Sequence, residues 1–132
     1  MKEELKIKDV MIGDWVDVRN NAAPNTPHLE RITPSHFLRD EYWYGIEIVA
    51  EILEKNGFEK QQGYIGSVFA FDDDDKDAHV IIHPKEDNYT RGAYTYIHIE
   101  HGCLSLDELP IEYIHELQHA LRLCKIDKEI NL

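Results

Sequence analysis

Three β-type runs in the middle of the chain, each bounded by turn-forming residues, constrain the possible folds most strongly. They cover residues 64–71, 79–83 and 94–101. Side chains alternate between the two faces of a strand, so Val80 and Ile82 share one face of the second run. Ile97 and Ile99 share one face of the third run in the same way. Because the connections between the runs are short and polar, the sequence predicts an antiparallel meander with these four side chains facing the core.

Two helical patterns flank the meander. The longer pattern runs from about residue 110 to 124, and its apolar side chains fall on one arc of the helix. The side chains on this arc are Tyr113, Ile114, Leu117, Ala120, Leu121 and Cys124. The arc predicts an amphipathic C-terminal helix that packs on the sheet. The shorter pattern covers residues 49–56 and ends at Asn56-Gly57, a left-handed helix stop.

The first 48 residues favour β-structure. Residues 5–18 predict a strand, a turn at Gly13-Asp14 and a second strand, which is how small SH3-like barrels often begin. The segments that follow are predicted to be a surface loop over 19–28, a helical turn over 35–39 and a strand over 42–48. The predicted fold class is therefore α+β, with an antiparallel sheet, an N-terminal SH3-like strand segment and a C-terminal amphipathic helix packed on the sheet.

Length and composition predict one domain over residues 1–132, made of a β-rich segment 1–48 and a second segment 49–132. The second segment holds the shorter helix, the three-strand meander and the C-terminal helix. No run approaches the roughly 18 apolar residues of a membrane span, and the first residues lack a signal-peptide core. We therefore expect a cytoplasmic protein that does not enter membranes, with Cys103 and Cys124 reduced.

The chain is strongly acidic. Its 26 Asp and Glu residues against 14 Lys and Arg residues give a formal net charge of −12. Such a charge repels phosphate backbones, and the basic residues are scattered singly, so direct nucleic-acid binding is not expected. The acidity serves solubility, or it forms a surface that docks on a basic partner or mimics nucleic acid.

Residues 115–119 spell HELQH and match the H-E-x-x-H signature of zinc metalloproteases. A catalytic zinc needs a third protein ligand as well as these two histidines. Lys125 stands where metzincins carry their third histidine. Glu129 is available as the glutamate ligand of a thermolysin-like site, but it lies very close to His119 in the chain. A third ligand would have to come from upstream, as His98 or His101, or from a second subunit.

A helical wheel tests the HELQH segment independently of spacing. At about 100° per residue, His115 and His119 fall almost opposite the centre of the apolar arc. Both histidines are therefore predicted to face away from the core. The segment is interpreted as part of a packing helix, and no catalytic, cofactor-binding or metal-binding residue is assigned.

A second group of histidines comes from the meander. His79 and His83 share the face of the second run opposite its apolar residues, and His98 with Glu100 shares the corresponding face of the third. These side chains could bind a metal adventitiously, or make stability pH-dependent below about 6.5.

The acidic run from residue 72 to 77 resembles a calcium loop only in its aspartates. Ala78 stands where an EF-hand needs glycine, and Pro84 stands where it needs glutamate. The run is therefore predicted to be a solvated hairpin loop.

Three segments carry a resemblance to a known family: Ile12-Gly13-Asp14-Trp15-Val16, the stretch from Glu51 to Phe58, and the stretch from Tyr113 to Leu121. In this order and spacing they resemble a family of small uncharacterised proteins from anaerobic gut bacteria and their phages or mobile elements. The resemblance implies a cytoplasmic accessory protein and carries over no catalytic or binding residue.

The function expected from the sequence is that of a non-enzymatic protein-interaction or regulatory module. Its partner is an unidentified protein, and a homodimer is left open. Two alternatives remain: an acidic inhibitor that mimics nucleic acid, and a minimal zinc hydrolase that uses the HELQH segment. Enzymatic activity is the less favoured expectation.

Overall fold

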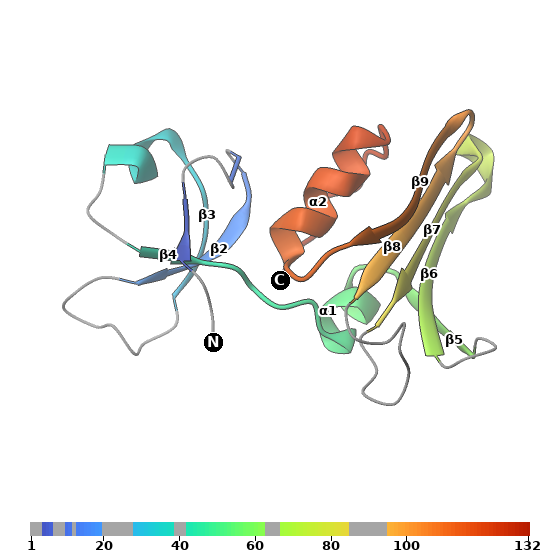
Figure 1. The fold of residues 1–132 in the computed structure, drawn as a ribbon, viewed down its shortest axis with the longest axis horizontal. Helices are drawn as coiled ribbons and strands as arrows, with labels where there is room; N and C mark the ends of the chain where they lie inside the picture. Colours follow the sequence, from blue (N-terminus) through green and yellow to red (C-terminus); the bar gives the residue numbers. More distant parts are fainter. Residues whose placement is uncertain are drawn as a thin grey trace. The chain divides into compact units, whose positions relative to one another are not determined.

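The protein is an α+β chain with two antiparallel sheets and a C-terminal helix, as the computed structural model in Figure 1 shows. The structure describes residues 4–6, 10–11, 13–19, 28–38, 42–62, 67–84 and 95–132. The contacts group the chain into two compact units, one of Met1–Glu47 with Tyr113–His115 and one of Ile48–Glu112 with Glu116–Leu132. The single-domain assignment stays a prediction. The boundary predicted after residue 48 lies one residue from the boundary between the units.

The N-terminal unit is built on a four-stranded sheet. Its strands are β1 (Glu4–Leu5), β2 (Trp15–Arg19), β3 (Leu29–Arg31) and β4 (Tyr42–Tyr44), in the order β1-β4-β2-β3. A 3-10 helix, η2 (Pro34–Leu38), precedes β4. The core of this unit includes Val16, Val18, Ile32 and Trp43. The turn at Gly13-Asp14 and the helical turn near residue 35 are confirmed, whereas β3 was not predicted. The likeness to an SH3 barrel stays a prediction.

The strand predicted over residues 42–48 is wrong in its second half. It ends at Tyr44, and only an isolated bridge between Glu47 and Tyr113 continues the pairing. Gly45 lies against the ring of Tyr113, where any Cβ would overlap ring atoms. The chain therefore leaves the sheet at a glycine because an aromatic side chain from a distant segment occupies the space there.

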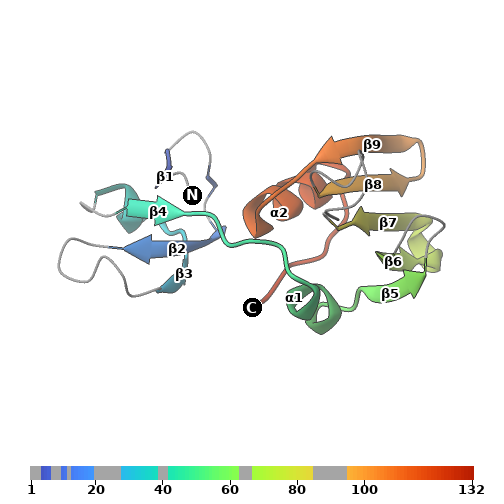
Figure 2. The same cartoon turned by 60° about the horizontal axis from the view of Figure 1, so that its bottom comes forward.

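The C-terminal unit holds a five-stranded antiparallel sheet in the simple order β5-β6-β7-β8-β9 (Figure 2). Its strands are β5 (Glu59–Gln62), β6 (Ser67–Asp73), β7 (Ala78–His83), β8 (Tyr96–His101) and β9 (Leu104–Pro110). The helices are α1 (Ala50–Lys55) and α2 (Ile114–Leu123), with a 3-10 turn η3 (Asp74–Lys76) between β6 and β7. The predicted meander is confirmed as β6, β7 and β8. The predicted helix start near residue 110 is wrong, because residues 104–110 form β9.

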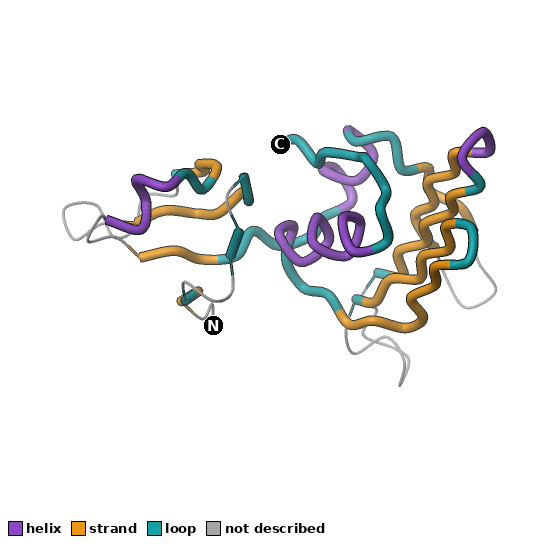
Figure 3. Tube along the Cα trace, turned by 90° about the horizontal axis from the view of Figure 1, so that it is seen from above, coloured by secondary structure: helices purple, strands orange, loops and turns teal. Residues whose placement is uncertain are grey.

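The inner face of this sheet carries the predicted core. Val80, Ile82, Ile97 and Ile99 are all fully buried, as period-2 alternation requires. The helix α2 lies over this face (Figures 1 and 3) and buries Leu117 and Leu121 completely.

Several expected segments differ in detail. The aspartate run begins inside β6, and only residues 74–77 form the turn, with Asp77 in the left-handed region. The predicted stop of α1 is confirmed, since Gly57 has a φ of 87° and its N–H bonds the carbonyl of Glu54. Parts of other predictions lie outside the described residues: 7–9, 12, 20–27, 39, 64–66, 85–88 and 94. No helix among the described residues has the length and apolar character needed to cross a membrane.

Candidate functional site

The HELQH segment forms the first turns of α2, and the structure places its side chains in structural contacts. Glu116 accepts a hydrogen bond from the backbone N–H of Glu112 through Oε1, at 3.0 Å, which caps the helix start. Leu117 lies in the core. His115 is only 3% exposed and stacks on Tyr113, with ring centroids 5.8 Å apart and an interplanar angle of 12°.

The prediction that His115 lies on an outer face of the helix is therefore wrong, because this side chain is buried, whereas His119 is half-buried. The helical wheel assumed one buried side, against the sheet. The start of the helix has a second neighbour, the segment around Ile46, whose carbonyl accepts the N–H of Ile114 at 2.8 Å. Together with the ring of Tyr113 on His115, this non-local bond gives the helix start neighbours that periodicity alone does not predict.

Gln118 has the clearest role in the segment. Its Nε2 donates to the carbonyl of Lys128 at 2.9 Å, and its Oε1 accepts the N–H of Ile130 at 2.8 Å. Asn56 bonds the end of the tail in the same way. Its Nδ2 donates to the carbonyl of Asn131 at 2.7 Å, and its Oδ1 accepts the N–H of Asn131 at 2.8 Å. Two buried amides therefore hold the C-terminal tail, residues 125–132, by its backbone.

A zinc site at His115 and His119 would need a third ligand, and His98 and His101 are the upstream candidates. His101 instead donates through Nδ1 to the carbonyl of Cys124, at 2.7 Å, and His98 contacts Asp107 on the other face of the sheet. Across the described parts of the chain, no three His, Cys, Asp or Glu side chains lie close enough to share a metal ion. Both cysteines are free thiols.

The outer face of the five-stranded sheet gathers the second predicted group of histidines. His79 and His83 alternate with the buried residues of β7, as predicted, and His98 lies opposite Ile81 in the adjacent strand β8. The ring of His83 stacks on Tyr96, with centroids 4.3 Å apart.

Carboxylates surround these histidines. His79 Nδ1 lies 2.7 Å from Asp72 and its Nε2 lies 3.5 Å from Asp77. His98 lies 2.9 Å from Asp107 and 3.4 Å from Glu100.

The environment moves the pKa values of two of these histidines in opposite directions. The hydrogen bond to Asp72 raises the pKa of His79 above 6.5, with smaller contributions from the charges of Asp72 and Asp77. Burial lowers the pKa of His83, and repulsion from His98 adds to this effect, with Glu108 opposing it. One histidine of the face therefore favours its charged form and another its neutral form.

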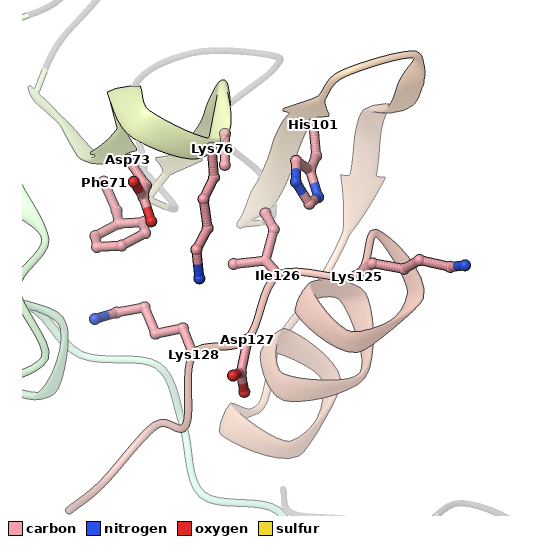
Figure 4. A pocket seen from close by; sticks show the side chains of 9 residues that line it. Phe71, Asp73, Lys76, His101, Lys125, Ile126, Asp127 and Lys128 are labelled. Carbon is pink, nitrogen blue, oxygen red and sulfur yellow. The ribbon is translucent and has the colours of Figure 1, made fainter.

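A small cavity lies on the inner side of the same unit, between the end of the sheet and the C-terminal tail (Figure 4). Its volume is only about 30 Å³, and it opens to solvent. Its lining combines apolar, basic and acidic side chains, among them Phe71, Lys76, His101, Ile126, Asp127 and Lys128. The ammonium of Lys128 lies 4.3 Å from the ring centroid of Phe71, and burial lowers the pKa of this lysine.

The sequence identified the histidine face but not the cavity. The face comes from adjacent strands whose alternation is visible in the sequence. The cavity joins residues around 71–78, His101 and the tail, and no local pattern relates these three segments. Gln118 and Asn56 bond backbone groups of the tail, and nothing in the sequence identifies these backbone partners.

Known proteins add nothing to the assignment of this site. The resemblance to small proteins of gut bacteria and their mobile elements stays a prediction. In comparisons with protein-family models, curated proteins and solved structures, no match to this chain was found.

Proposed function

We propose that this protein is a non-enzymatic, cytoplasmic interaction module that docks a basic protein surface on the outer face of its five-stranded sheet. The observation that carries the proposal is the composition of that face. Over β6 to β9 it presents carboxylates beside histidines, and no lysine or arginine lies among these contacts. We call this surface the histidine–carboxylate face and define it by Asp72, Asp77, His79, His83, His98, Glu100 and Asp107.

The carboxylates of this face are accessible. The side chains of Glu100 and Asp107 are 57% and 76% exposed, so a partner can reach them without any rearrangement. The face as defined holds four carboxylates and three histidines, so the carboxylates outnumber the histidines. The face is therefore negative at neutral pH, and the net charge of −12 adds long-range attraction for a basic partner.

The histidines add a chemical condition to docking. The hydrogen bond to Asp72 raises the pKa of His79, and protonation of this histidine cancels part of the negative charge of Asp72 and Asp77 beside it. A basic partner is then attracted less and competes with imidazolium groups for the same oxygens. Docking is therefore expected to weaken as the pH falls from about 7 to about 5.

The test uses a short peptide of alternating lysine and alanine, titrated into isotopically labelled protein at low salt. The proposal expects backbone amide shifts centred on β7, β8 and β9. The double variant Glu100→Gln with Asp107→Asn should bind the peptide several-fold more weakly. The matched control is Glu51→Gln with Glu54→Gln, which removes the same charge from exposed positions of α1.

Equal weakening in both double variants would mean that the peptide senses only net charge, and the proposed docking face would be rejected. Shifts centred on other elements would lead to the same conclusion. Unchanged affinity at about pH 5 would remove the role given to the histidines.

A further inference from the structure

The strand β9 forms an open edge of the five-stranded sheet. In the order β5-β6-β7-β8-β9 it pairs with β8 on one side, and no strand of the described residues pairs with it on the other (Figure 2). All of its residues are exposed except Leu106, which is half-buried. Such an edge offers backbone N–H and C=O groups to an extended segment that lies beside it.

The inner side of β9 is apolar. Leu106 pairs with Ile99, which is fully buried, so Leu106 lies on the inner face of the sheet. Leu109 pairs with the buried Ile97 in the same way, and Leu104 shares the face of Leu106 because it lies two positions away. Leu104 and Leu109 are nonetheless 38% and 37% exposed. The apolar layer of the core therefore continues to the edge of the sheet and stays open there.

The outer side of β9 is acidic and belongs to the histidine–carboxylate face. Asp107 lies 2.9 Å from His98, and its side chain is 76% exposed. Glu100, on the neighbouring strand β8, is 57% exposed. A segment beside β9 would therefore meet leucines with the side chains that point inward and carboxylates with those that point outward.

The backbone of β9 sets the length of the run that can pair. Glu108 has a φ of 50°, and the register between β8 and β9 shifts at this point of the strand. Pro110 has no N–H to donate. The run open to pairing is therefore Leu104–Asp107.

Two other pairings fit these residues poorly. The opposite edge strand, β5, has only exposed polar residues, and its Lys60 repels a basic segment. A second copy of β9, paired antiparallel, would place the Asp107 side chains of both copies on one face of the joined sheet, where their charges repel. The edge at β9 therefore suits a segment of opposite charge.

We propose that β9 binds an extended segment of a partner protein as an additional strand, and that the side chains of this segment alternate between apolar and basic. Its backbone pairs along Leu104–Asp107. Its apolar side chains cover the leucines on the inner side, and its lysines or arginines contact Asp107 and Glu100. This inference rests on the proposed function, because the same carboxylates attract the partner, and it adds how the backbone of that partner is held.

The experiment titrates isotopically labelled full-length protein with a peptide of alternating leucine and lysine. This peptide should bind several-fold more tightly than the lysine–alanine peptide, because its leucines cover the apolar side of β9. It should also slow hydrogen exchange at the amides of Leu104–Asp107 that point away from β8. Two further peptides carry N-methyl groups, one on its leucines and one on its lysines. Since alternate N–H groups of a strand point to opposite edges, one of these two peptides should bind about tenfold more weakly than the other.

A pair of variants tests the apolar side. Leu104→Ala should weaken binding of the leucine–lysine peptide about fivefold and leave binding of the lysine–alanine peptide unchanged. The matched control is Leu29→Ala, the same change at a leucine 48% exposed on β3, an edge strand of the other sheet. This control should leave both affinities unchanged. The N-methylated peptides act on the parent protein, so they test the proposal even if Leu104→Ala loosens β9.

Equal binding of the leucine–lysine peptide and both N-methylated peptides would overturn the proposal, because backbone pairing would then hold nothing. In that case the docking face itself still stands if the lysine–alanine peptide binds and Glu100→Gln with Asp107→Asn weakens it. Equal weakening by Leu29→Ala and Leu104→Ala would overturn the proposal as well. If neither peptide binds, the docking face is rejected together with the strand addition.

Discussion

Replacing Gln118 by alanine should release the C-terminal tail from α2. Gln118 is 5% exposed and makes two hydrogen bonds to the tail backbone, one with the carbonyl of Lys128 and one with the N–H of Ile130. Alanine keeps the helix but leaves both backbone groups without this partner. The fold then responds in one of two ways.

Both responses have a similar magnitude. If the tail stays in place, two buried backbone groups lose their partner, at about 1–3 kcal/mol each. If the tail detaches, Ile130, which is 1% exposed, and Ile126 enter water, at about 1.5–3 kcal/mol each. The free energy of unfolding should therefore fall by about 2–6 kcal/mol, which is a large part of the stability of a small protein.

Urea unfolding measures the loss, and hydrogen exchange at the Ile130 amide distinguishes the two responses. Exchange at this amide accelerates far more than in the sheet if the tail detaches locally. The control is Leu123→Ala on the same helix, a side chain 67% exposed, which should cost less than about 0.5 kcal/mol. Gln118→Glu adds a second test, because its buried carboxyl can donate to the Lys128 carbonyl only when protonated, so stability should recover as the pH falls.

A loss below about 0.5 kcal/mol for Gln118→Ala, with unchanged exchange at Ile130, would refute the reasoning. It would mean that the tail is held by its apolar side chains alone. The structural account of the HELQH segment would then lose its strongest support.

Three further predictions follow from the same structure. Gly45→Ala should lower the thermal midpoint of the N-terminal unit by several degrees, because the new Cβ overlaps the ring of Tyr113, and an unchanged melt would show that the ring moves freely. Because the pKa of His83 is lowered in the folded protein, its contribution to the free energy of unfolding is fully present above pH 6.5 and is lost as the pH falls below this value. His83→Gln should therefore show a smaller fall in unfolding midpoint than the parent protein below about pH 6.5, and an equal fall would contradict this assignment. Zinc added to metal-free protein should leave the thermal midpoint unchanged both in the parent and in His119→Ala, and a rise confined to the parent would revive the zinc hydrolase.

The inner face of the C-terminal sheet was predictable because it follows one local rule. Val80, Ile82, Ile97 and Ile99 recur at every second position of their strands, and burial on one face requires this spacing. The edge strand β5 lacks the pattern, and β9 stays mostly exposed although Leu104 and Leu106 alternate with polar residues. All four residues of β5 are exposed and polar, and β9 ends in Pro110, which an edge strand tolerates.

Of the candidate sites, one follows from local sequence patterns and the others depend on contacts between distant segments. The histidine–carboxylate face follows from alternation within strands and from the pairing of adjacent strands, and both could be anticipated. The helix start beside His115 is hydrogen-bonded to Ile46, nearly 70 residues away in the chain, and no periodicity encodes this contact. The cavity depends on the path of the tail after α2, which is fixed by backbone bonds to Gln118 and Asn56.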